Sequence, residues 1–172
     1  MAELRIQERL QPSLLDRLTD DEPGKKVEAA DKRVLTKAQL RQAVLRDLAW
    51  LLNATQLQAV QDLSAYPFVQ SSVLNYGLPA FAGITASTLD STELERSIHQ
   101  AILSFEPRIL PETLRVQSIV GESQLDQHNV VAIQIEGRLW MEPVPLEILL
   151  RTEVDLESGE VQIKDLEAAR GV

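Results

Sequence analysis

The sequence predicts an α+β fold in which helices pack on a roughly four-stranded, mainly antiparallel sheet. Apolar residues recur at helical spacing through the first two thirds of the chain, and their period changes to two after Pro111. With 172 residues, 44% hydrophobic and 25% charged, the composition is that of one globular domain. We expect a short helix and a charged linker over residues 1–33, followed by a single α+β domain over residues 34–172.

The N-terminal region contains one short candidate helix, over residues 12–18, in which three leucines share a face. It could dock on the body of the protein or on a partner. Residues 20–33 are dominated by charged side chains and contain a proline and a glycine. Because such a segment cannot bury enough apolar surface to offset its ordering entropy, we interpret it as a linker or a mobile loop.

Two longer helices have sequence signals at both ends. Thr36, with Gln39 three residues later, predicts a capping box at the start of a helix that runs to about residue 53. The same pattern at Asp90 and Glu93 predicts a second helix. This helix should end near residue 105, because Pro107 disfavours helical geometry at the residue before it.

The segment between these helices has a different character. Residues 66–83 contain four of the seven aromatic side chains, interrupted by prolines and glycines. We expect this segment to be irregular and too apolar to remain in solvent. It should either wrap across the core or present an apolar surface to another subunit.

Four strands are predicted after Pro111, over residues 116–120, 131–139, 146–154 and 161–163. Short polar connections over residues 124–129 and 157–159 favour an antiparallel meander. A sheet of four strands has two edges, which can pair with another chain unless they are protected. Charged residues near the last two strands favour protection as the alternative: Glu153, Asp155, Glu157, Glu160, Lys164 and Asp165.

Several classes of function are disfavoured by composition. The net charge of −9 repels nucleic acid and anionic membranes, and no run of residues has the length and apolar character of a membrane span or an export signal. No cysteine and no glycine-rich phosphate loop occur, and His99 and His128 have no companions at metal-ligand spacing. We therefore expect a cytoplasmic protein without a cofactor, metal site or membrane insertion.

The corner Glu106-Pro107-Arg108 follows directly on the second predicted helix. The proline fixes the chain direction, so that Glu106 and Arg108 can project to the same side. One interpretation is internal, with Arg108 capping helix carbonyls and Glu106 pairing with it. The other is a rigid recognition element, in which Arg108 donates forked hydrogen bonds to a partner's carboxylate or carbonyls.

Four short runs occur in an order and spacing typical of one family. They are Ser13-Leu14-Leu15-Asp16-Arg17-Leu18, Leu51-Leu52-Asn53, Ser72-Val73-Leu74-Asn75-Tyr76-Gly77-Leu78-Pro79 and Glu106-Pro107-Arg108. With these runs, residues 12–166 resemble the TssE family of type VI secretion baseplate subunits. That family is related to the phage tail baseplate wedge proteins that carry the historical label "lysozyme-like".

The resemblance implies a structural role without catalysis. It implies binding to the baseplate subunits TssF and TssG, near TssK, and initiation of the TssB/TssC contractile sheath by strand addition at an open sheet edge. The partner-binding residues that it implies are Glu106, Pro107, Arg108, Leu51, Leu52, Asn53, Asn75, Tyr76 and Gly77. Ala54-Thr55-Gln56 stands where many relatives have an arginine after the second run, so the resemblance supports no basic contact there.

Two alternatives stay open from the sequence. One is a peptidoglycan-cleaving muramidase with Glu106 as its general acid, and the other is a wedge protein of a phage-like contractile tail. If Arg108 serves recognition alone, Arg108→Ala should weaken binding to TssF and TssG without changing the melting temperature.

Overall fold

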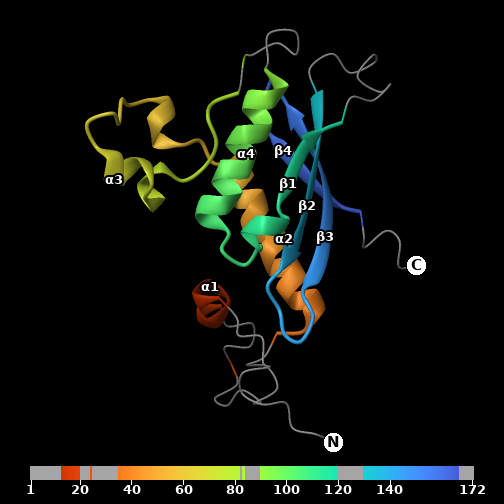
Figure 1. Ribbon diagram of the computed structural model, residues 1–172. Helices are drawn as coiled ribbons and strands as arrows, with labels where there is room; N and C mark the ends of the chain where they lie inside the picture. The colour runs from red at the N-terminus through yellow and green to blue at the C-terminus, as the bar shows by residue number, and fades with distance from the viewer. Residues whose placement is uncertain are drawn as a thin grey trace, which may run out of the picture.

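The computed structural model describes residues 13–19, 24, 35–81, 83, 90–119 and 130–166. Two long helices, α2 (Lys37–Asn53) and α4 (Ser91–Phe105), cover one face of a four-stranded antiparallel sheet (Figure 1). The strands are β1 (Arg115–Ser118), β2 (Val130–Leu139), β3 (Leu146–Asp155) and β4 (Val161–Asp165), in that spatial order. The predicted α+β fold and the antiparallel meander are therefore confirmed.

The two helices begin where the sequence predicts, although their caps differ. Thr36 and Gln39 form the expected capping box, in which the Thr36 hydroxyl accepts a hydrogen bond from the Gln39 N–H at 3.2 Å. At α4, the Asp90 carboxylate accepts from the Thr92 N–H instead, at 2.9 Å. Both arrangements satisfy an N–H that has no partner within the helix.

The core lies between these helices and the inner face of the sheet. Alternate residues of β2 and β3 point towards the helices, and Thr152 satisfies its buried hydroxyl by donating to the Ile133 carbonyl at 3.2 Å. The fully buried large side chains include Leu48, Ile98, Ile102, Ile133, Ile135, Leu139, Leu150 and Leu156. The residues between them on the strands form a polar outer face, where Lys164 donates to Glu153 at 2.8 Å.

A side chain from each of the two long helices forms hydrogen bonds with the backbone of an edge strand. On β4, the Asn53 amide accepts from the Val161 N–H at 2.9 Å and donates to the Val161 carbonyl at 2.8 Å. On β1, Glu95 accepts from the Ser118 N–H at 2.7 Å. Each side chain takes the place of one residue of an added strand. Among the described residues, this contact shortens the part of each edge that another strand could pair with.

Residues 55–78 form a projection that we call the arm. It contains two single 3₁₀ turns, η3 (Leu57–Ala59) and η4 (Val73–Asn75), and one short helix, α3 (Pro67–Gln70), which projects away from the sheet in Figure 1. A bridge between Thr55 and Leu78 closes its base. The sequence predicted an irregular segment here. Tyr76 packs against the core, as one of the two alternatives expects, whereas Phe68 is exposed to solvent. Contact of this segment with another subunit stays a prediction.

The other elements are short. Helix α1 spans Leu14–Leu18, within the predicted range, and η5 spans Pro111–Thr113 before β1. The predicted turn over residues 124–129 lies outside the described residues, as does the predicted linker over residues 20–33 except for Gly24. Within the described ranges, no helix combines the length and the apolar character that crossing a bilayer requires.

Candidate partner-binding groove

The Glu106-Pro107-Arg108 corner is fixed by the end of α4 and by β2. Helix α4 stops at Glu106, whose N–H still donates to the Ile102 carbonyl, and Pro107 then turns the chain. The Leu110 N–H donates to the Arg138 carbonyl at 2.8 Å, and the Trp140 N–H donates to the Arg108 carbonyl at 2.7 Å. The corner is therefore a short antiparallel extension beside the last residues of β2, and its backbone is held from both sides.

The side chains of this corner pair with each other. Arg108 donates from Nε to Glu106 Oε1 at 2.7 Å and from Nη2 to Glu106 Oε2 at 2.5 Å. Only 4% of Glu106 is exposed, so its carboxylate has exchanged water for this two-point contact. The internal interpretation of the Glu106–Arg108 pair thus describes the observed geometry, and the Nε–Nη2 fork is already occupied.

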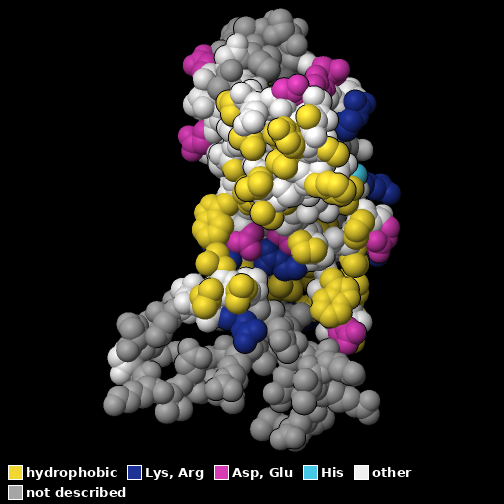
Figure 2. Space-filling view, turned by 90° about the vertical axis from the view of Figure 1, so that its left-hand side faces the viewer, with side chains coloured by type: hydrophobic (Ala, Val, Ile, Leu, Met, Phe, Trp, Pro, Cys, Tyr) yellow, Lys and Arg dark blue, Asp and Glu magenta, His cyan; other side chains and the backbone are white. Residues whose placement is uncertain are grey.

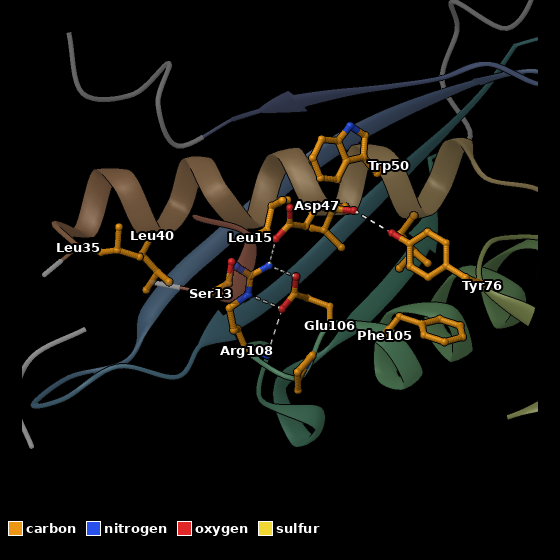
Figure 3. Close-up of a pocket in the computed structure, with 13 residues that line it drawn as sticks. Ser13, Leu15, Leu35, Leu40, Asp47, Trp50, Tyr76, Phe105, Glu106 and Arg108 are labelled. Carbon is orange, nitrogen blue, oxygen red and sulfur yellow. Dashed lines mark hydrogen bonds and ion pairs between the residues drawn. The ribbon is translucent and has the colours of Figure 1, made fainter. Parts of the chain in front are cut away.

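Helix α2 extends this pair into a line of alternating charges (Figure 3). Nη2 of Arg108 also donates to Asp47 Oδ2 at 2.6 Å, and Nη2 of Arg46 lies 2.8 Å from Asp47 Oδ1. Burial acts to lower the pKa of Arg108, but the hydrogen bonds and charges of Glu106 and Asp47 outweigh it and raise this pKa above its ordinary value. Arg108 therefore remains charged at every physiological pH.

The line of charges ends at α1. Nη1 of Arg46 donates to Asp16 Oδ1 at 2.7 Å, and the Ser13 hydroxyl donates to Asp16 Oδ2 at 2.6 Å. Burial acts to raise the pKa of Asp16, but these hydrogen bonds from Ser13 and Arg46 lower it overall. No residue of α1 is buried, so polar contacts hold this helix on α2 while Leu14 and Leu18 remain exposed.

A groove of about 540 Å³ runs along this line of charges. Its walls are mostly apolar, and Tyr76 and Phe105 meet edge to face at one end, with ring centroids 5.1 Å apart. Trp50 lies on the rim, half exposed, with the Arg46 guanidinium 5.1 Å from its ring centroid.

Partial burial and the charges of Asp47 and Glu106 raise the pKa of Tyr76, so its phenol stays neutral. Figure 2 shows charged side chains surrounded by hydrophobic ones on this face.

The structure brings several of the sequence-predicted residues to the groove. Pro107 is exposed on its rim, and Arg108 and Tyr76 are half-buried in its lining. Glu106 and Leu51 also line it, although their side chains are almost fully buried. The internal pairing of Glu106 and Arg108 reverses the expectation for Arg108→Ala, which should now lower the melting temperature.

The remaining predicted residues have internal roles and do not line the groove. Leu52 lies in the core, Asn53 is exposed but binds the edge of β4, and Asn75 is buried within the arm. Gly77 has φ of +117° at the base of the arm, where a Cβ atom would lie 2.3 Å from the Ala54 carbonyl oxygen. Partner contact through Leu52, Asn75 or Gly77 would have to be indirect, through the shape that these residues impose.

Sequence reasoning missed Arg46, Asp47 and Trp50. One signal for Asp47 was present, because it lies three residues after Val44 and four before Leu51, on the edge of the apolar face of α2. A carboxylate at such a position needs a cationic partner, and Arg108 supplies it. Among the described residues, no group of three or more histidine or acidic side chains is placed to hold a metal ion.

Comparison with known proteins identifies a related family. A family model described as baseplate wedge protein gp25 matches residues 38–144, which is more than half of the chain and includes α2, the arm, α4 and the Glu106-Pro107-Arg108 corner. Searches of curated proteins and of solved structures found no match. On this match, the chain belongs to the baseplate wedge protein gp25 family.

Proposed function

We propose that this protein is a non-enzymatic, cytoplasmic subunit of the type VI secretion baseplate. In this proposal it binds the wedge subunits TssF and TssG, near TssK, and initiates assembly of the TssB/TssC sheath. The family match carries the proposal, because it covers most of the residues that line the groove and all of the charged corner. The four runs that resemble TssE support the assignment to a secretion system.

The chemistry of the groove suits a protein partner. Its walls are mostly apolar, and each of its charged groups has an internal ion-pair partner, so a partner's apolar side chains can be buried there without leaving an unpaired charge. Among the described residues, the hydrogen bonds of the Arg108 guanidinium use Nε and Nη2. We propose that Nη1 is the atom that a carbonyl or carboxylate of the wedge partner approaches.

The sheet supports the second half of the proposal. An extended segment of a sheath subunit can pair with an outer strand through main-chain hydrogen bonds, with alternate side chains giving specificity. Asn53 and Glu95 occupy one position each on β4 and β1. Strand addition would therefore proceed along the remaining length of an edge strand.

The geometry of Glu106 argues against the muramidase alternative. A general acid must carry a proton that it can deliver to the leaving oxygen. Both carboxylate oxygens of Glu106 instead accept hydrogen bonds from Arg108, and the residue is 4% exposed. This is the arrangement of a structural carboxylate that is engaged by Arg108 and has little access to a substrate.

A wedge protein of a phage-like contractile tail is the second candidate. The description of the matching family, baseplate wedge protein, fits it as well as it fits a secretion baseplate. The same groove and sheet edge would serve in either particle. The genes that neighbour this one distinguish the two, because a secretion cluster also encodes TssF, TssG and TssK.

The groove proposal predicts that Trp50→Ala and Pro107→Ala each weaken binding to a co-expressed TssF–TssG pair by at least tenfold. Trp50 is a half-exposed aromatic side chain on the rim, which is typical of interface residues that contribute strongly to affinity. Biolayer interferometry measures the effect. Gln117→Ala, on the outer face of the sheet, is the control and should bind like the wild type. Wild-type affinity in both groove variants would contradict the proposal.

A further inference from the structure

We propose that the outer face of the arm is a second interaction surface, which another baseplate subunit covers with an uncharged, apolar patch. This inference rests on the proposed function, since it assigns a contact within the same assembly. It concerns side chains that the groove does not use. The arm carries Val60, Tyr66, Phe68, Val73 and Leu74 as exposed large hydrophobic residues.

The arm is unusual in both exposure and charge. Phe68 is 89% exposed and Val60 is 82% exposed, and hydrophobic side chains gather on the face that the arm presents in Figure 2. Each of the five residues is more than half exposed, and a group of exposed large hydrophobic side chains on one segment is typical of a protein–protein interaction site. Asp62 is the one charged residue in the arm, although 25% of the whole chain is charged.

The arm is held in shape from inside, so its surface is formed before any partner binds. The buried Asn75 side chain accepts from the Gln58 N–H at 2.9 Å and donates to the Gln70 carbonyl at 3.1 Å, which ties η3 and α3 to η4. Leu63 is 2% exposed and anchors the middle of the segment. A surface that is already ordered loses little conformational entropy on binding.

The chemistry of the arm defines its occupant. A charged group placed against this patch would lose its hydration without gaining a counter-charge, so the contacting surface of the partner must be uncharged and apolar. The rest of this chain contributes nearly all of its net charge of −9. Basic residues around the rim of the partner's patch would therefore be attracted, which favours a different protein over a second acidic copy of this chain.

Phe68→Ser and Val60→Ser test the proposal against a matched control, Val144→Ser. Val144 is also exposed, at 64%, but it lies in the β2–β3 connection at the far end of the molecule from the arm (Figure 1). We expect each arm variant to bind a co-expressed TssF–TssG pair at least tenfold more weakly than the wild type. The control should bind normally, and all three variants should keep the wild-type melting temperature, because none of these side chains is buried.

The possible outcomes separate the two proposals. If the wild type binds TssF–TssG and both arm variants bind equally well, the arm proposal is wrong and the proposed function stands. If the wild type does not bind the pair at all, the proposed function fails and the arm proposal fails with it. Light scattering tests whether the arm binds a second copy of this chain. A wild-type dimer that Phe68→Ser converts to a monomer would show that it does, and would contradict the proposal of a different partner.

Discussion

Arg108→Ala should lower the free energy of unfolding by about 3 kcal/mol. Breaking a buried ion pair costs ~3–5 kcal/mol, and the lower end applies here because part of the Arg108 side chain still meets water. The variant leaves the Glu106 carboxylate buried and the Asp47 carboxylate half-buried, both without the guanidinium. In a chain of this size the melting temperature should fall by roughly 6–12 °C, which differential scanning calorimetry measures.

Arg138→Ala is the control for this effect. Arg138 forms an exposed ion pair with Glu147 at 3.6 Å, and such pairs contribute ~0–1 kcal/mol. The double variant Glu106→Ala with Arg108→Ala should lose less stability than the sum of the single losses, because it removes the buried charge together with its partner. If Arg108→Ala cost no more than the control, Arg108 would be free for recognition alone.

Gly77→Ala should cost about 2–4 kcal/mol of unfolding free energy. Gly77 has φ of +117°, which residues with a side chain rarely adopt, and the new Cβ would lie 2.3 Å from the Ala54 carbonyl oxygen. That oxygen accepts the Leu78 N–H at 2.8 Å, so relief of the clash must open the base of the arm. Chemical denaturation measures the loss, and hydrogen exchange should show early opening at Leu78.

Gly83→Ala separates the two causes. Gly83 also has a positive φ, of +84°, but a Cβ atom there would meet nothing within 4 Å. This variant should therefore cost only the conformational penalty of ~1–2 kcal/mol. Equal losses in the two glycine variants would show that the contact with Ala54 does not constrain the arm.

The helices and strands were predictable because they depend on neighbours in sequence. The Thr36–Gln39 box and Pro107 determine helix ends through contacts within a few residues. The alternation from Val131 to Leu139 reports which face of a strand is buried, and this again needs only local spacing. These signals act within about one turn of helix or a few residues of strand, so a single sequence carries them.

The charged site was predictable only in part. The pairing of Glu106 with Arg108 is local, two residues apart, and was one of the two interpretations of the corner. Asp47 joins Arg108 from 61 residues away and Asn53 reaches Val161 from 108 residues away, and both contacts depend on how the helices cross the sheet. No local pattern encodes such a distance. The position of Asp47 at the edge of the apolar face of α2 indicates that its carboxylate needs a cationic partner, but it does not identify that partner as Arg108.

Several residues that are predicted to bind partners also make internal contacts that shape the surface that a partner would meet. Asn75 orders the arm, Asn53 limits one edge of the sheet, and Gly77 allows the arm to close on Ala54. The exposed residues of the arm and of the groove rim would then make the direct contacts.

Sheath assembly in living cells tests the central claim, that this protein acts as a structural part of a contractile baseplate. The measurement is fluorescence microscopy of labelled TssB in the native host, with the gene deleted and then restored. We predict that the deletion abolishes sheath filaments and that the restored wild-type gene returns them. Normal numbers of contracting sheaths in cells without the protein would contradict the account.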